Sequence, residues 1–114
     1  MKRGEVWEVN LDPTIGAEIK KTRPCLIVSR DALAKLPWKI VVPLTEWSPR
    51  FEKARWHVLV EATRESGLSK KSSADTFQVR SISEERLVRR IGRLSDEVMA
   101  RIGDGLALSL ALGK

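Results

Sequence analysis

The sequence predicts a mainly β fold (β-rich α+β), with a single domain over residues 1–114 in which a small barrel of strands precedes a C-terminal helix. Short apolar segments recur along most of the chain, and clusters of Gly, Pro and charged residues separate them, as is typical of strands joined by turns. Only the segment after Ser95 has the spacing of an amphipathic helix. A chain of 114 residues has room for a single core.

Three strands are predicted in the first half of the chain, over residues 5–11, 23–29 and 38–45. The segment 12–22 between the first two is a loop of a length that is often functional in small domains. One helical turn is expected over residues 31–36.

Alternation in the third strand assigns each side chain to a face. Trp38, Ile40, Val42 and Leu44 are expected to point to the core, which places Thr45 on the opposite face. Because Trp38 follows this alternation, we expect it in the core or in a dimer interface.

Three further strands are predicted over residues 56–61, 72–80 and 87–94, and Ser83 is expected to cap a short turn before the last. The final helix is expected to begin after the N-cap residue Ser95 and to end near Gly113. Its apolar face contains Val98, Ile102 and Leu106. Gly103 and Gly105 should weaken it by about 1 kcal/mol each relative to alanine.

A single cysteine, Cys25, and a single histidine, His57, limit the available chemistry. A lone cysteine excludes an internal disulfide, and this pair is too small for a structural zinc site, so no metal or cofactor is expected. No apolar run approaches the roughly 20 residues that cross a membrane. The first residues also lack the apolar segment of a secretion signal, so we expect a cytoplasmic protein.

Two side chains are candidate phosphate ligands. Arg23 lies where the loop 12–22 meets a strand, and a guanidinium group binds phosphate through two parallel hydrogen bonds. Thr45 ends a strand with a hydroxyl group that could donate to a phosphate oxygen. The net charge of +6 favours a polyanionic partner. Taken singly, a surface ion pair for Arg23, a turn-closing Thr45 and a charge that serves solubility are the more ordinary explanations.

Linked motifs are more specific than any single residue. They are Arg3-Gly4-Glu5-Val6-Trp7, Asp12-Pro13-Thr14-Ile15-Gly16-Ala17-Glu18, Thr22-Arg23-Pro24, Pro43-Leu44-Thr45 and Gln78-Val79-Arg80-Ser81-Ile82-Ser83. In this order they resemble the MazF/PemK family of toxin ribonucleases over essentially the whole chain.

The resemblance implies an SH3-like β-barrel with a C-terminal helix (the PemK/CcdB-like toxin fold) and a homodimer. It implies a toxin that cuts single-stranded RNA without a metal, because the RNA's own 2′-hydroxyl attacks the adjacent phosphate and leaves 2′,3′-cyclic phosphate and 5′-hydroxyl ends. The expected partner is a cognate antitoxin with an acidic C-terminal tail. Arg23 and Thr45 match the catalytic pair of the family.

The resemblance also suggests an RNA groove. Its candidate residues are Glu18, Lys20, Lys21, Trp47, Ser73 and Gln78. Trp47 could stack on an unpaired base. A solvated loop acid for Glu18 and hydrogen bonding within the barrel for Gln78 remain alternatives.

Two departures remove helpers that some relatives use. Ala17 replaces a histidine of the loop motif, and Phe77 replaces an acid before the Gln78 motif. Asp75, two residues earlier, could substitute, although a solvent-facing or turn carboxylate is the more ordinary role. His57 is far in sequence from Arg23 and Thr45, so a structural role is expected for it.

The sequence therefore assigns no general base. Two other functions also remain open: a toxin of the same fold that binds DNA gyrase, and an RNA-binding barrel without catalysis.

Overall fold

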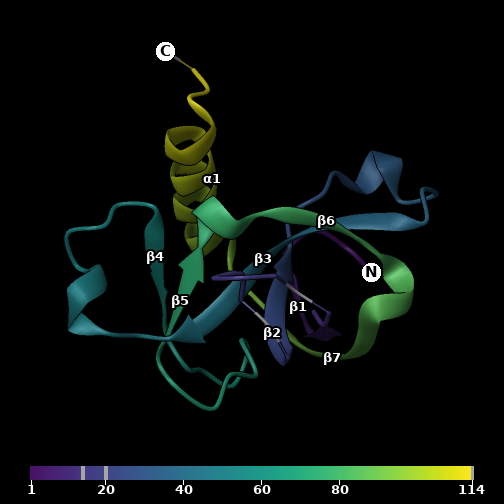
Figure 1. Ribbon diagram of the computed structural model, residues 1–114, viewed down its shortest axis with the longest axis horizontal. Coiled ribbons are helices and arrows are strands. Elements are labelled where there is room, and N and C mark those ends of the chain that lie inside the picture. The colour runs from purple at the N-terminus through teal and green to yellow at the C-terminus, as the bar shows by residue number, and fades with distance from the viewer. Residues whose placement is uncertain (14, 20, 114) are drawn as a thin grey trace.

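The computed structural model describes residues 1–13, 15–19 and 21–113, which form an antiparallel β-sheet and one C-terminal helix, α1 (Figure 1). This confirms the predicted fold class. The strands are β1 (Glu5–Asn10), β2 (Thr22–Ile27), β3 (Trp38–Glu46), β4 (His57–Val60), β5 (Ser72–Asp75), β6 (Arg80–Ser83) and β7 (Leu87–Arg93). Helix α1 spans Asp96–Leu110. The predicted strands in the first half and the turn near residue 31 are confirmed to within two residues, apart from that turn's shorter extent, Asp31–Leu33.

The strands follow the order β4-β5-β3-β2-β1-β7, and β6 pairs with β3 beside this path. Strand β3 therefore has two partners on one edge: its first half pairs with β6 and its last residues pair with β5. The two ends of the path, β4 and β7, are not paired in the part of the chain that the structure describes, so the barrel is not closed by strands.

A loop spans this opening instead. The backbone N–H of Arg93 on β7 donates to the carbonyl of Glu65 at 2.9 Å. Gly67 of the same loop has a φ of +71°, and a Cβ there would lie 1.8 Å from the carbonyl oxygen of Ile91. Glycine is therefore required where the loop closes on β7.

Apolar side chains form two clusters, one on each face of the sheet. The first cluster contains Leu26, Val42, Leu44, Val58 and Ile102 among others, with α1 packed against it. The second cluster contains Val9, Leu11, Cys25, Ile27, Val41 and Ile82. Because β2 and β3 contribute alternate residues to both clusters, the middle of the sheet is buried on both faces.

The core assignment for β3 is partly wrong. Val42 and Leu44 are buried and Thr45 lies on the opposite face, as predicted. Trp38 and Ile40, however, are 56% and 44% exposed. The side chains at the beginning of β3 alternate between the two faces as predicted. The apolar cluster under α1 does not extend that far, however, so Trp38 and Ile40 lie on a face that nothing in the cluster covers.

The single strand predicted over residues 72–80 is also wrong. A 3₁₀ turn, η3 (Thr76–Gln78), separates β5 from β6. Thr76 is fully buried and its hydroxyl donates to the carbonyl of Trp56 at 2.6 Å. The Asp75 side chain accepts from the N–H of Phe77, which caps the turn. These bonds replace the strand ladder and let β5 and β6 take different parts of β3.

Helix α1 stands beside β4 and β5, and its C-terminal end projects beyond the sheet (Figure 1). Ser95 caps the helix through a hydrogen bond from the N–H of Val98, as predicted, whereas the helix ends before Gly113, at Ala111 in the left-handed conformation. Gly105 has a use that propensity alone does not predict: a Cβ there would lie 2.9 Å from Thr76, so glycine permits close packing on η3. In the part of the chain that is described, no helix has the length and apolar character to cross a membrane.

Candidate active site

Four neighbouring strands present polar side chains on the face of the sheet opposite α1. Thr45 on β3 lies opposite Ser73 on β5, and His57 on β4 lies opposite Asp75 on β5. In the β2–β3 ladder Cys25 pairs with Pro43, and two more residues in the same register put Arg23 across from Thr45. Residues distant in the sequence thus meet because the strands that carry them are adjacent.

A cavity of about 430 Å³ opens over this row. Arg23, Thr45, His57, Asp75 and Gln78 all line it. Arg23 and Thr45 also line a neighbouring hollow of about 240 Å³ beside Ser72. The structure therefore brings the two predicted catalytic residues together, and it places Arg23 where a phosphate in either hollow could meet its guanidinium group.

Cys25 lies in the same strand as Arg23 but is buried beneath the site. Burial raises the pKa of its thiol to about 12, against the smaller opposing effect of Arg80 and Arg23. The thiol is therefore protonated at physiological pH and does not serve as a nucleophile.

His57 lines the same cavity, a position that its distance in sequence from Arg23 and Thr45 did not predict. Its Nδ1 lies 2.8 Å from the hydroxyl oxygen of Ser73, and its ring stacks on Phe51 with the centroids 3.8 Å apart and the planes at 6°. Burial lowers the pKa of His57 below its usual 6.5; the carboxylate of Asp75 opposes this shift and Arg50 adds to it. A neutral imidazole therefore predominates at neutral pH.

Asp75 does not face solvent: it is 7% exposed and lines the cavity. It is a turn carboxylate as well: one oxygen accepts from Phe77 N at 3.2 Å and the other from Gln78 Nε2 at 3.3 Å. Gln78 in turn accepts from the N–H of Ile19 at 2.9 Å. This chain of bonds ties the end of the 12–22 loop to the site.

The groove residues of the loop lie in different positions. Glu18 is exposed, but its carboxylate accepts from Ile15 N at 2.6 Å, and it lines a hollow with Phe77 and Gln78. Lys21 is exposed with a φ of 71°, and its N–H donates to Asp12. Lys20 lies outside the described residues. Direct contact of these residues with RNA stays a prediction.

Ser73 and Trp47 are not among the described residues that line the cavity. Ser73 is fully buried and contacts His57, so any effect it has on a ligand passes through that ring. Trp47 packs edge-on against Phe51 at 5.9 Å, with the ammonium of Lys71 5.9 Å from its ring. Phe51, which sequence reasoning missed, lines the cavity instead. Phe77 is 69% exposed at the rim of the neighbouring hollow.

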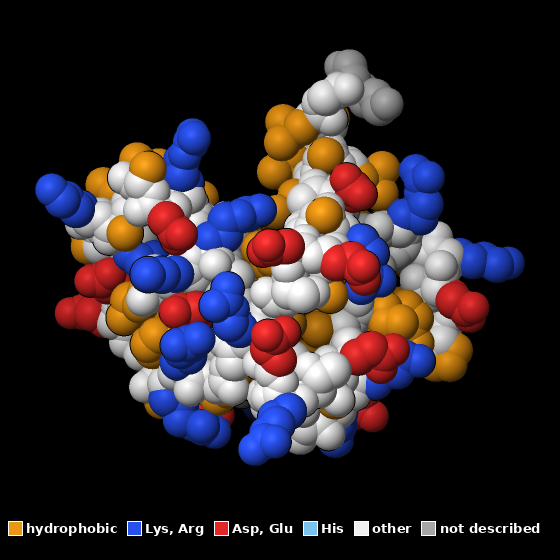
Figure 2. Space-filling view, turned by 180° about the vertical axis from the view of Figure 1, so that it is seen from behind, with side chains coloured by type: hydrophobic (Ala, Val, Ile, Leu, Met, Phe, Trp, Pro, Cys, Tyr) orange, Lys and Arg blue, Asp and Glu red, His pale blue; other side chains and the backbone are white. Residues whose placement is uncertain are grey.

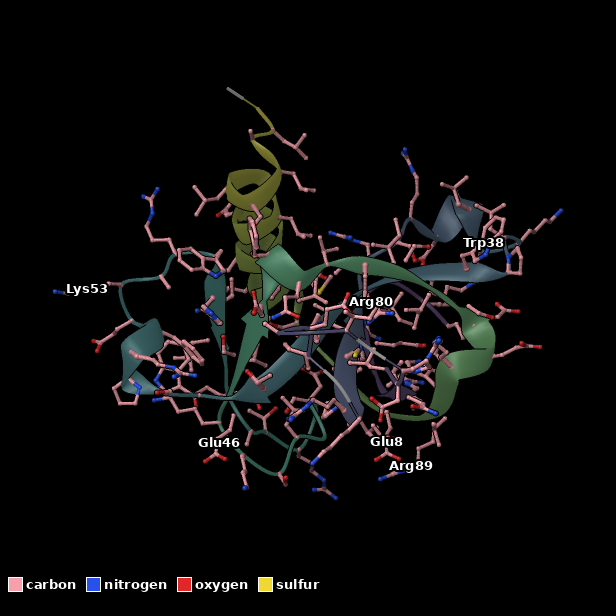
Figure 3. The ribbon with its side chains drawn as sticks, in the orientation of Figure 1. Glu8, Trp38, Glu46, Lys53, Arg80 and Arg89 are labelled. Carbon is pink, nitrogen blue, oxygen red and sulfur yellow. The ribbon has the colours of Figure 1, made fainter. Side chains whose placement is uncertain are left out.

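Charge is spread over the surface. Figure 2 shows Lys and Arg side chains over the face seen from behind, with acidic side chains between them. Figure 3 shows Glu46 at the end of β3 and Lys53 on the segment before β4, on the same side of the molecule. Among the described residues, no three His, Cys, Asp or Glu side chains gather as a metal site requires.

The arrangement can bind and polarise a phosphate diester. The guanidinium and hydroxyl groups of β2 and β3 and the imidazole and carboxylate of β4 and β5 line the same cavity. The first pair can stabilise negative charge on phosphate oxygens, and the second can exchange a proton.

Residues 2–110 match the model of the PemK-like, MazF-like toxins of type II toxin–antitoxin systems. The chain belongs to this family. Among curated relatives, endoribonuclease MazF9 of Mycobacterium tuberculosis is 38% identical over 118 residues, covering 98% of each chain. Endoribonuclease EndoA of Bacillus subtilis is 34% identical over 115 residues, covering 98% of this chain and 96% of the relative.

Solved structures show the same fold for this MazF-like chain. MazF of Deinococcus radiodurans superposes with a TM-score of 0.82 at 20% identity, covering 98% of this chain and 97% of that one. An endoribonuclease from a mycobacterial species, solved with its cognate antitoxin, gives a TM-score of 0.78 at 19% identity over 100% of this chain and 98% of that one. The open sheet and C-terminal helix are thus the MazF-like toxin fold.

Proposed function

We propose that this chain is the endoribonuclease toxin of a type II toxin–antitoxin system and that it cuts single-stranded RNA without a metal ion. The observation that supports this most is the meeting of Arg23 and Thr45 at one cavity. Curated relatives that match nearly the whole chain are named endoribonucleases. The proposed reaction is attack of the RNA 2′-hydroxyl on the adjacent phosphorus, which leaves 2′,3′-cyclic phosphate and 5′-hydroxyl ends.

Arg23 and Thr45 have complementary roles in this proposal. The attack places additional negative charge on the non-bridging oxygens of the phosphate, and the fixed cation of Arg23 stabilises it. Thr45, on the neighbouring strand, donates its hydroxyl hydrogen to the same group. Removal of one such donor typically costs about 10²–10³ in rate.

The RNA path extends from this cavity toward the loop 12–22. Gln78 lines both the catalytic cavity and the hollow that contains Glu18. We propose that Glu18, Lys20, Lys21, Trp47 and Gln78 contact nucleotides beside the scissile phosphate, and that Ser73 acts through His57. The exposed ring of Phe77, at the rim of that hollow, is a further surface on which a base can stack.

The proposal includes a homodimer and an antitoxin. Trp38 and Ile40, exposed side by side at the start of β3, offer an apolar surface to a second copy, with Leu33 and Leu36 nearby in sequence. An antitoxin with an acidic C-terminal tail suits a net charge of +6 and would compete with RNA for the cavity. We place this toxin in the cytoplasm and treat residues 1–114 as one domain, which the family match over residues 2–110 supports.

The test is an RNA digestion in excess EDTA. Unstructured RNA is incubated with the protein, and the fragment ends are mapped chemically. We expect cyclic-phosphate and 5′-hydroxyl ends, and a loss of about 10²–10³ in rate for Arg23→Ala. Arg23→Lys, which keeps the charge but not the bidentate fork, should recover part of this loss.

Intact RNA would contradict the proposal. If the wild-type protein bound RNA without cutting it, the chain would be an RNA-binding barrel. If it poisoned DNA gyrase and left RNA intact, it would act as a gyrase toxin of the same fold.

A further inference from the structure

The ring of His57 is fixed in two independent ways. Phe51 stacks on its face with the planes at 6°, and Ser73 Oγ lies 2.8 Å from Nδ1. A third ring, that of Trp56, lies 5.7 Å away at a tilt. The stack fixes the ring plane and the hydrogen bond fixes its rotation within that plane. Nε2 is then the nitrogen through which the imidazole can meet a ligand in the cavity.

The proposed reaction needs a proton acceptor that the predicted catalytic pair does not supply. Arg23 stays charged at any working pH, and a threonine hydroxyl such as that of Thr45 is a very weak base. Both carboxylate oxygens of Asp75 already accept hydrogen bonds from its own turn. Among the described residues that line the cavity, His57 is the side chain whose ordinary pKa lies near neutrality.

The charges around His57 favour its neutral form. Asp75 from β5 acts on it with negative charge and Arg50, within η2 (Pro49–Phe51), with positive charge. Arg23 and Glu46 line the same cavity. His57 also lines a second hollow of about 420 Å³, together with Arg55, Arg101 and Asp104. Burial is the largest influence, and the pKa of the ring falls below 6.5. Asp75 is placed to stabilise the imidazolium once it forms.

We infer that Nε2 of His57 accepts the proton of the RNA 2′-hydroxyl during cleavage, while Nδ1–H donates to Ser73 Oγ. The inference rests on the proposed ribonuclease function. In this step the bond from the 2′-oxygen to phosphorus forms and the bond from phosphorus to the 5′-oxygen breaks. The 2′-proton passes to Nε2, the 5′-oxygen takes a proton from water, and the imidazolium later releases its proton to solvent.

The first test compares kinetics with a titration of the ring itself. Because the chain has one histidine, its Hε1 proton gives a single NMR resonance and a direct pKa. The wild-type kcat/KM should rise with pH and level off at that same pKa, below 6.5. A kinetic pKa that differs from the NMR value would overturn the assignment.

Two substitutions distinguish the role of the basic nitrogen from the packing role of the ring. His57→Phe keeps the stack on Phe51, and His57→Gln keeps a polar group near Ser73. Both should slow cleavage by about 10²–10⁴ and remove the acidic limb of the profile. Binding of an all-2′-deoxy substrate analogue should stay within threefold of wild type. Full activity in either folded variant, or an acidic limb that persists, contradicts the inference.

Ser73→Ala keeps the proposal testable if the His57 variants fail to fold. Loss of the Ser73 hydroxyl removes the partner of Nδ1, so the NMR pKa and the kinetic acidic limb must move together, with kcat reduced and KM little changed. A limb that does not follow the NMR pKa overturns the role of His57. If the wild-type protein cuts no RNA at all, the proposed function itself has failed, and that outcome is distinct from an active enzyme that does not need His57.

Discussion

The two halves of β3 have the same alternating pattern of side chains but different surroundings. In the first half, which pairs with β6, Trp38 and Ile40 stand exposed. In the last residues, which pair with β5, Leu44 is buried in the cluster that contains Ile102 of α1, and Thr45 lines the cavity with Arg23. Figure 3 shows Trp38 and Glu46 well apart, at the two ends of this one strand.

The difference comes from the neighbours and not from the strand. The apolar cluster that contains Ile102 of α1 and Val58 of β4 covers one face of the last residues, so the polar side chains on the other face lie on a packed support. The same cluster does not cover the beginning of β3. One end is thus suited to hold catalytic groups, and the other has apolar surface left for a partner.

The largest expected effect is at the catalytic end. Thr45→Val keeps the shape of the side chain and removes its hydroxyl group, so kcat for RNA cleavage should fall by about 10²–10³. Thr45→Ser should stay within about tenfold of wild type. The dimer dissociation constant, measured by sedimentation, should not change. Full activity of the Thr45→Val variant would contradict a catalytic role for this end of β3.

The next effect is at the exposed end. Trp38→Glu places a charge on the surface proposed for a second copy, and loss of a tryptophan anchor costs about 2 kcal/mol or more, which is roughly 30-fold in dissociation constant. Sedimentation velocity over a dilution series measures it. Ile15→Glu, at an exposed residue of the loop, is the control and should leave association unchanged. Equal effects of both would mean that the dimer uses another surface.

The smallest effect concerns Lys39, which is buried on the face opposite Trp38. Its ammonium donates to the carbonyls of Ala34, Leu36 and Trp38 at 3.0–3.3 Å and pairs with Glu84 at 3.1 Å. Lys39→Met keeps the aliphatic stem but leaves these acceptors without their donor. We expect a loss of about 1–2 kcal/mol in the free energy of unfolding by urea.

The rate of RNA cleavage shows whether the effect of Lys39→Met stays at the beginning of β3 or reaches the residues at its other end. The kcat of Lys39→Met should stay within about twofold of wild type at a temperature where the variant is folded. A large loss of kcat in folded protein would show that the two halves of β3 are coupled and not independent.

Local signals predicted most elements. Turn clusters, alternation and the Ser95 cap located the strands and the helix to within a few residues. The failure over residues 72–80 has a largely tertiary cause: Thr76 is buried and bonds to Trp56, twenty residues away in the chain, while the carboxylate of Asp75 caps the resulting turn. The role of Gly105 is tertiary in the same way: helix propensity predicts only its cost, whereas its close contact with η3 explains why glycine is there.

By itself, the sequence determined the fold class and the family, and it predicted Arg23 and Thr45 as the catalytic pair, because short motifs and periodicity depend on residues that are close in the chain. The tertiary structure decided which side chains join that pair. His57 reaches Ser73 and Asp75 only through the β4–β5 register. A loop of eleven residues joins those strands, and nothing in local patterning fixes how such strands pair. The exposure of Trp38 was decided in the same way, by where the apolar cluster under α1 ends.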